Sequence, residues 1–208
     1  MYKIGEVKGL AKKVAKSFTE LKIDPNMDVG DDYRYRAFGV GHIKDGKITI
    51  SPHEEVFHQS KKLNEYKGGI DRQFPLIDID IAQIVADDII AKHAYPNVPK
   101  EDYQFGIHQI RIKTTNVMTG KPAPEGSHQD GFDYICVTCA GLTNIAGGNS
   151  ILFDAKNKDK ILLNEILEEE QTIIFDDKKY FHYASPVVPA LPGIGYRDVF
   201  VVTLQKAV

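Results

Sequence analysis

The sequence contains very little cysteine: Cys136 and Cys139 are its whole thiol inventory. This scarcity fits a reducing cytosol. A C-x-x-C spacing occurs in redox pairs and in zinc sites. Here, however, it lies in a β-like run at 134–139, where residues three apart point to opposite faces. No second pair is present to complete a zinc site. We therefore expect two buried, structural cysteines.

Long apolar runs are also absent. None approaches the roughly 20 residues that cross a bilayer, and no apolar segment follows the charged first residues, as a targeting signal would require. The charges are balanced, with 26 Lys and Arg against 29 Asp and Glu and a formal net charge of −3. Such a chain has no global positive field to hold nucleic acid. We therefore expect a soluble, cytoplasmic protein that binds neither membranes nor nucleic acid.

The chain has no internal repeat, low-complexity tract or long linker. Its 208 residues suit one ordinary domain with a substantial core. We therefore expect residues 1–208 to form a single domain. The sequence leaves open an oligomer of identical chains.

The two halves of the chain differ in their apolar pattern. Residues 1–100 are mixed, and helical spacing predicts one amphipathic helix near 7–21 and a second, buried helix over 79–94. From Tyr103 onward, short apolar runs predict strands at 104–113, 132–140, 150–153, 172–175, 180–188 and 196–204. We therefore expect a mainly β protein with flanking helices, in which residues 103–205 form a double-stranded β-helix of the jelly-roll or cupin-like type.

A candidate metal site begins at the entrance to a predicted strand, in the segment Pro124–Gly131. It contains His128-x-Asp130, and a β-like backbone can aim two side chains that are two residues apart to the same side. His182, in a later strand, would complete a face of two histidines and one carboxylate. Such a face leaves three positions open on a six-coordinate ion, as non-haem iron oxygenases require.

Arg197 strengthens this interpretation. It lies inside the otherwise apolar strand 195–203, and a buried arginine is costly unless an anion meets it. A dicarboxylate co-substrate would supply that anion, because a guanidinium matches a carboxylate with two parallel hydrogen bonds. The alternative is a structural ion pair, for instance with the neighbouring Asp198.

The order His128-x-Asp130, His182, Arg197 resembles the Fe(II)/2-oxoglutarate-dependent dioxygenases. Further segments are similar to the bacterial subfamily that includes L-isoleucine 4-hydroxylase: GIHQIR at 106–111, LTNIAGG at 142–148, RDV at 197–199 and, earlier, positions 59–61, 64, 68–69 and 72–74. The resemblance spans roughly residues 33–205.

The resemblance implies a jelly-roll fold, Fe(II), 2-oxoglutarate, O2 and hydroxylation of a free aliphatic L-amino acid with release of succinate and CO2. It also implies that His128, Asp130 and His182 bind the iron and that Arg197 binds the distal carboxylate of 2-oxoglutarate. One position departs from the wider superfamily, because Val199 stands where many relatives have serine. A second polar contact to 2-oxoglutarate must therefore come from elsewhere.

A free amino acid needs a fixed cation for its carboxylate and usually an anion for its ammonium. Arg111 is our first candidate for the carboxylate, with Arg72 and Arg36 behind it, and Glu125 is the candidate for the ammonium. A surface charge would also explain Arg36 and Arg72, and a loop-fixing hydrogen bond would also explain Glu125. Two other functions stay open: a cupin-type metalloenzyme that does not use 2-oxoglutarate, and a non-enzymatic jelly-roll binding module.

Overall fold

The computed structural model describes residues 2–53, 57, 58 and 71–207. The segments 59–61, 64 and 68–69, which contribute to the family resemblance, lie outside these residues. The described chain is mainly β, and its strands pair antiparallel within each sheet. No helix in this part of the chain is long and apolar enough to span a bilayer.

A seven-stranded sheet forms the larger layer. Its strands lie in the order β1 (Lys3–Glu6), β11 (Gln171–Asp176), β7 (Tyr134–Thr143), β14 (Gly195–Lys206), β6 (Tyr103–Thr114), β2 (Arg34–Lys44) and β3 (Lys47–Ile50). The first hundred residues therefore supply more than helical support, because β2 pairs along most of its length with β6. Its inner arginines and its glycines obscured this strand in the sequence.

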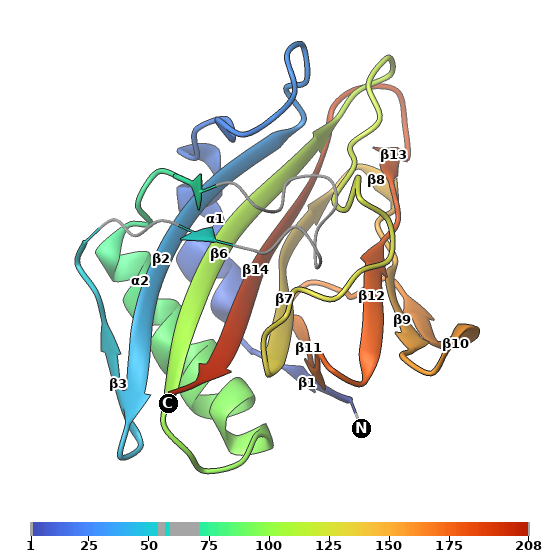
Figure 1. Cartoon of the computed structure of the whole chain (residues 1–208). Helices are drawn as coiled ribbons and strands as arrows, with labels where there is room; N and C mark the ends of the chain where they lie inside the picture. The colour runs from blue at the N-terminus through green and yellow to red at the C-terminus, as the bar shows by residue number, and fades with distance from the viewer. Residues whose placement is uncertain (1, 54–56, 59–70, 208) are drawn as a thin grey trace.

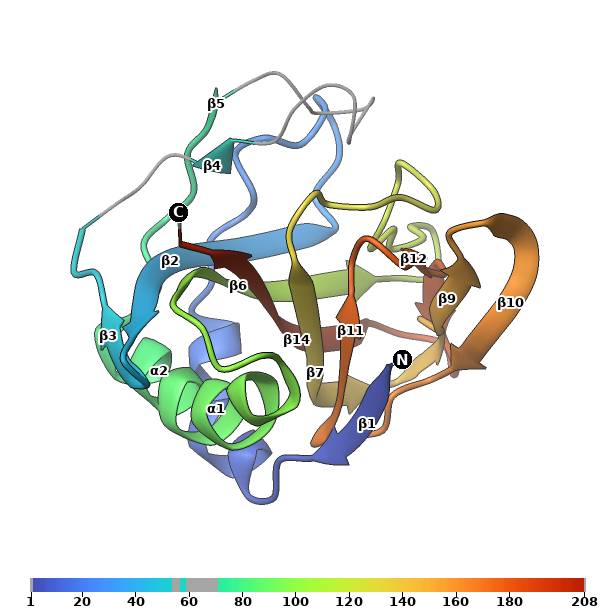
Figure 2. The ribbon, with the colours of Figure 1, turned by 60° about the horizontal axis from the view of Figure 1, so that its bottom comes forward.

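The smaller layer faces one end of the large sheet (Figures 1 and 2). It contains β10 (Asn157–Glu165), β9 (Ser150–Asp154) and β12 (Tyr180–Ala184), with the pair β8 (Ile145–Gly147) and β13 (Val187–Pro189) alongside. The predicted strand 180–188 is thus divided near Pro186, which has no N–H to continue the ladder. A further short pair is β4 (Phe57–His58) with β5 (Asp71–Arg72). Together the two layers confirm the jelly-roll with flanking helices.

The helices cover the outer face of the large sheet, as Figure 2 shows. They are α1 (Leu10–Thr19), α2 (Ile79–Ile84), the π-helical η1 (Val85–Ala94) and the short η2 (Tyr95–Asn97). Asp78 caps α2 by accepting hydrogen bonds from the N–H groups of Asp80 and Ile81. Both helices expected from the sequence are present.

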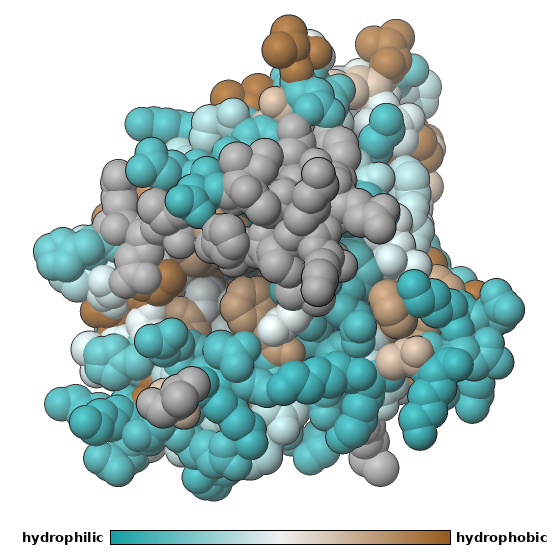
Figure 3. All heavy atoms as spheres, viewed as in Figure 1, coloured by the Kyte–Doolittle hydropathy of each residue, from teal (hydrophilic) through white to brown (hydrophobic). Residues whose placement is uncertain are grey.

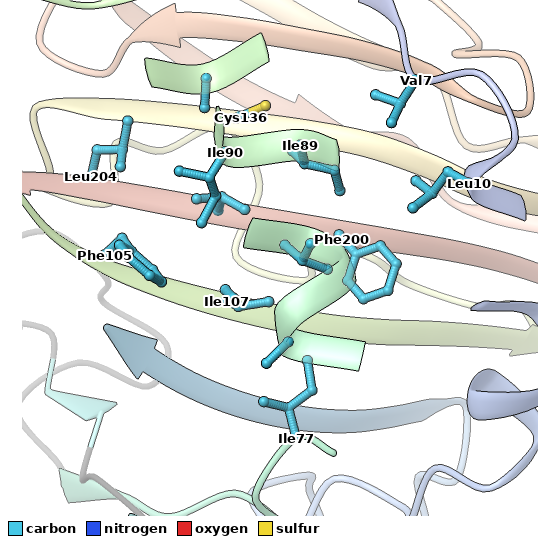
Figure 4. Packing of buried hydrophobic residues seen from close by; sticks show 14 of the residues in the cluster. Val7, Leu10, Ile77, Ile89, Ile90, Phe105, Ile107, Cys136, Phe200 and Leu204 are labelled. Atoms are coloured by element: carbon cyan, nitrogen blue, oxygen red, sulfur yellow. The ribbon is translucent and has the colours of Figure 1, made fainter. Parts of the chain in front are cut away.

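The apolar core under these helices joins them to the sheet. Figure 4 shows Leu10, Ile89 and Ile90 packed on the strand residues Ile107 and Phe200, all of which are essentially fully buried. Burial of each such side chain contributes roughly 1.5–3 kcal/mol. Along β14, Phe200 faces the helices, so the residues on either side of it point to the other face, toward the smaller sheet. This alternation decides which side chains reach the site.

Cys136 and Cys139 follow the same alternation. Both are buried free thiols on β7. Cys136 belongs to the cluster under the helices, and Cys139 belongs to a second cluster between the sheets. The expectation of two buried cysteines on opposite faces is confirmed.

Several large apolar side chains are exposed on the outer surface of the described chain. In the space-filling view the lower edge is mainly hydrophilic, and hydrophobic residues stand at the tips of loops at the top (Figure 3). Val29 and Val117 are fully exposed. Such single exposed residues are ordinary for a folded domain.

Candidate active site

Two backbone hydrogen bonds bring the histidines of the predicted metal site together. The N–H of His128 donates to the carbonyl of His182 at 3.0 Å, and the N–H of His182 donates back at 2.9 Å. His128 lies in the loop between β6 and β7, and His182 lies in the middle of β12. The reciprocal pair holds the two imidazole rings with their centres 4.3 Å apart.

Asp130 completes the group. Its Oδ1 lies 3.5 Å from Nε2 of His128, and its Oδ2 lies 3.3 Å from Nε2 of His182. One ligand atom from each of the three residues lies within 4.8 Å of the others, so one ion can contact all three. The Nδ1–H of His128 donates to the carbonyl of Gly126 at 2.8 Å, which leaves Nε2 free for a metal. Two imidazoles and one carboxylate on one side form a donor set that suits non-haem iron(II).

Contacts within the group stabilise the charged forms of the Asp130 carboxylate and the His182 imidazole. Burial opposes ionisation of Asp130, but its contacts with the two imidazoles outweigh burial and hold its pKa well below the usual range. Burial likewise opposes protonation of His182, but its contacts with Asp130 and Asp177 outweigh burial and raise its pKa to about 10. Without a metal, protonation of the imidazole therefore balances the negative charge of the Asp130 carboxylate. A divalent cation takes over this role when it displaces the proton.

Asp177 is a functional candidate that the sequence analysis missed. Its side chain is buried, and its carboxylate accepts the N–H of Gly131 at 2.7 Å and the N–H of Asp130 at 3.3 Å. Its Oδ1 also lies 3.5 Å from Nδ1 of His182. One carboxylate thus contacts both segments that carry the predicted ligands. No sequence signal marks it, because Asp176-Asp177 looks like an ordinary polar turn.

A cavity of about 160 Å³ lies between the two sheets beside this group. Much of its wall is apolar and includes Ile110, Ile112, Val199 and Phe175. Charged side chains also reach it: Arg34, Arg36, Arg72, Glu125, Asp130 and Arg197. A small ligand with an aliphatic part and anionic groups matches such a lining.

Arg197 is a buried cation in this wall. It is 4 % exposed, and it has no hydrogen bond or ion pair with any residue of the described chain. Burial lowers its pKa below the usual range for arginine. Asp198, the acid considered as its alternative partner, points to the other face of β14 and binds Arg111 instead.

Arg111 lies away from the cavity. Its guanidinium donates to both oxygens of Asp198, at 2.7 and 2.6 Å, and it stacks on Tyr196 with 4.5 Å to the ring centre. The sequence correctly placed Arg111 on one face with Gln109, but that face meets the helices, as the hydrogen bond from Gln109 to Ser17 of α1 shows. The structure therefore contradicts the expected role of Arg111 in binding a substrate in this cavity.

The other predicted substrate residues do reach the cavity. Arg36 and Arg72 line it. Glu125 lines it as well, with its Oε1 3.4 Å from Nε2 of His128. The structure thus brings together the three metal-ligand candidates with Arg197, Glu125, Arg36 and Arg72, and it leaves out only Arg111.

Comparison with known proteins places this geometry in a family. The family model described as "2OG-Fe dioxygenase" matches residues 15–203. L-isoleucine-4-hydroxylase of Bacillus thuringiensis is 24 % identical over 177 residues, which are 77 % of this chain and 70 % of that protein. The match favours the dioxygenase over the metalloenzyme without 2-oxoglutarate and over the non-enzymatic module.

Solved structures share the fold. The crystal structure of IDO from Bacillus thuringiensis has a TM-score of 0.73 and 22 % identity, with 96 % of this chain and 86 % of that chain covered. A bsmA homolog from Methylobium petroleophilum PM1 has a TM-score of 0.74 and 21 % identity, with 97 % and 85 % covered. With the family model matching nearly the whole chain, this protein belongs to the 2OG-Fe dioxygenase family, enzymes that use Fe(II), 2-oxoglutarate and O2.

Proposed function

We propose that this enzyme hydroxylates a free aliphatic L-amino acid of the isoleucine, leucine or methionine type. The observation that carries the proposal is the shared cavity: the three metal-ligand candidates, a buried arginine with no partner among the described residues and an apolar wall all meet there. The similarity to an L-isoleucine-4-hydroxylase supports the same substrate class.

In this proposal His128, Asp130 and His182 hold the iron. Iron bound there supplies oxygen activation coupled to decarboxylation of 2-oxoglutarate to succinate and CO2, with insertion of one oxygen atom into a C–H bond of the substrate. Because these three residues approach from one side, a metal held by them would stay accessible to 2-oxoglutarate and O2. The hydrogen bond from His128 to Gly126 fixes the orientation of that ring.

Arg197 binds the distal carboxylate of 2-oxoglutarate. Its guanidinium is buried in the cavity wall without a counter-ion in the described chain, so a carboxylate placed there satisfies the charge with a bidentate contact. Val199, which follows on the same face of β14, adds only apolar surface.

The remaining lining positions the amino acid. Ile110, Ile112 and Phe175 exclude water and hold an aliphatic side chain near the metal group. Glu125, within reach of the metal group through its contact with His128, accepts the ammonium. Arg72 adds a positive charge at the cavity.

The test is succinate formation from 2-oxoglutarate with Fe(II), with and without a panel of L-amino acids, combined with mass spectrometry of the amino acids. We expect one or more aliphatic members to stimulate succinate formation and to gain one oxygen atom. Asp130→Ala is the control, and it should abolish both signals and weaken Fe(II) binding while the protein stays folded. If no free amino acid is oxidised and none stimulates succinate formation, the proposed substrate class is wrong.

A further inference from the structure

Arg36 is a second buried cation of the cavity. It lies on β2, opposite Ile110 of β6, and is 8 % exposed. Its guanidinium carbon lies 4.1 Å from the centre of the Phe74 ring, and one terminal nitrogen lies 2.7 Å from Nδ1 of His108. Its Nε is buried and has no hydrogen-bond partner in the part of the chain that the structure describes. Packing thus holds the guanidinium, while part of its hydrogen-bonding capacity stays unused.

No carboxylate of the described chain pairs with Arg36. Its neighbour Arg34 differs in this respect, because its Nε donates to Asp24 at 2.8 Å. Burial lowers the pKa of Arg36 to about 9, and the positive charge of Arg34 acts in the same direction. A buried cation left in this state is unfavourable until an anion arrives. An anion that enters the cavity and contacts Arg36 would therefore be bound favourably.

His108 fixes the guanidinium without neutralising it. A guanidinium only donates hydrogen bonds, so Nδ1 of His108 must accept, and the ring is neutral with its proton on Nε2. The ring stacks on Phe38 with centres 4.5 Å apart. This neutral, immobilised partner sets the direction of the guanidinium and leaves its charge available to a ligand.

Arg36 and Arg197 belong to two different binding points. Arg36 lies on β2 and Arg197 on β14, with β6 between them. Neighbouring strands are about 4.8 Å apart, so the two backbones are separated by roughly 10 Å. One carboxylate group does not bridge two such positions with bidentate contacts. Arg36 and Arg197 therefore need two separate anionic groups. In the proposed complex, 2-oxoglutarate has one carboxylate at the metal and the other at Arg197, so the anion at Arg36 must come from another molecule.

We propose that Arg36, oriented by His108, binds the α-carboxylate of the amino-acid substrate. This inference rests on the proposed function and deepens it, because it makes the enzyme select amino acids over otherwise identical compounds in which a neutral group replaces the carboxylate. It also replaces Arg111, whose charge is already used by Asp198 on the opposite face of the sheet.

The experiment compares L-isoleucine, L-leucine and L-methionine with their carboxamides, which keep the ammonium and side chain but lose the carboxylate charge. Binding is measured calorimetrically under anaerobic conditions to the enzyme loaded with Fe(II) and 2-oxoglutarate. The variants are Arg36→Met, which removes the charge, and Arg36→Lys, which keeps a charge but lacks the planar fork. Arg111→Lys is the matched control, because it changes a half-buried arginine of the same sheet on the face away from the cavity.

The parent should bind the best acid roughly 30-fold more tightly than its amide, since a buried charged pair is formed only with the acid. Arg36→Met should bind acid and amide equally, at the level of the parent with the amide. Arg36→Lys should lose most of the preference, and Arg111→Lys should keep all of it. Affinity for 2-oxoglutarate should stay within about twofold in every variant.

Three results overturn the proposal. An Arg36→Met enzyme that still prefers the acid as strongly as the parent assigns the carboxylate to another residue, and the proposed function then stands. A loss of 2-oxoglutarate affinity in Arg36→Met and Arg36→Lys, with the acid preference kept, makes Arg36 a co-substrate residue. A parent that binds neither acids nor amides removes the amino-acid substrate itself, which is the failure of the proposed function.

Discussion

Asp177 places its Oδ1 3.5 Å from Nδ1 of His182, the ring nitrogen that does not face Asp130. This Nδ1 is buried, and no described residue lies within normal hydrogen-bond distance of it. If Nε2 of His182 is to ligate a metal, Nδ1 must carry the proton and needs an acceptor. Asp177 is placed to be that acceptor, and the same carboxylate holds the backbone at Asp130 and Gly131.

We predict that Asp177→Asn weakens metal binding by about 10- to 100-fold, the range found for lost outer partners of metal-bound histidines. Once the asparagine oxygen accepts the N–H of Gly131, its amide N–H2 faces His182 and favours the wrong tautomer. Fe(II) affinity, or Co(II) affinity read by absorption, measures the effect without turnover. Asp133→Asn is a matched control, because Asp133 is also buried, lies in the loop that carries His128 and Asp130, and accepts hydrogen bonds from the Lys178 ammonium and the Lys206 N–H.

A direct measurement on the parent complements the variants. In the protein loaded with Zn(II), nitrogen NMR should show His182 protonated at Nδ1, with that proton shifted downfield by its hydrogen bond to Asp177. Metal affinity that is the same in Asp177→Asn as in Asp133→Asn, or a His182 ring protonated at Nε2, would contradict the positioning role.

The burial of the two thiols predicts that both react slowly in the native protein at pH 8. Burial raises the pKa of Cys136 and of Cys139 to about 11. The reactive thiolate is therefore scarce below that value, and access is blocked as well. At pH 8 the native protein should leave both thiols unmodified by an aromatic disulfide reagent over an hour, whereas in denaturant both should react within minutes. Rapid reaction of one thiol in the native protein would contradict its structural role.

The metal group was predictable because its chemistry is local and unusual. His128-x-Asp130 needs only a β-like backbone to aim both side chains to one side, and Arg197 stands out as a charge among apolar residues. The reciprocal hydrogen bonds between His128 and His182 are a long-range feature. The sequence indicated that the three residues belong together, but it did not indicate how they are held.

The orientation of Arg111 could not be predicted from the sequence pattern. Alternation along a strand tells which residues share a face, but it does not tell which of the two faces meets the helices. Arg111 was chosen because it shares a predicted strand and face with Gln109, and only the structure reveals that Asp198 on the neighbouring strand neutralises it. Asp177 was missed for the converse reason, since its partners are 46 and 47 positions away in sequence.

Two of the strands that escaped prediction have residues that break the apolar pattern for a physical reason. Strand β2 places Arg34 and Arg36 on its inner face, where both side chains line the cavity. Strand β10 is largely exposed and rich in Lys, Asp and Asn. A binding site and a solvated edge both override the alternation on which the prediction depends.

We predict that a side chain at position 148 weakens 2-oxoglutarate binding by displacing Arg197. The φ of Gly148 is +75°, and a Cβ at this position would lie 3.0 Å from Cδ of Arg197 and 2.9 Å from Val187. Gly148→Ala should therefore displace the guanidinium and raise the apparent 2-oxoglutarate constant about tenfold, as expected for one weakened charged contact. Gly30→Ala is the control, because its φ of +93° gives the same backbone strain with nothing within 4 Å. Equal constants in the two variants would contradict the mechanism.

Arg197→Leu separates a co-substrate residue from a structural one. In the absence of ligand, Arg197 is a buried charge without a counter-ion in the described chain. Removing such a charge should leave the melting temperature of the ligand-free protein unchanged or raise it. The parent should be stabilised further by 2-oxoglutarate in the presence of a metal, whereas the variant should gain little, because a ligand stabilises only in proportion to its binding.

The apparent 2-oxoglutarate constant of Arg197→Leu should rise strongly, by an amount that corresponds to a loss on the order of 2–5 kcal/mol. Metal affinity should stay nearly intact, since the residues proposed as iron ligands are untouched. Thermal scans with and without 2-oxoglutarate, together with the steady-state constant, measure both effects. A large drop in the melting temperature of the ligand-free variant, with an unchanged 2-oxoglutarate constant, would identify Arg197 as part of a structural ion pair instead.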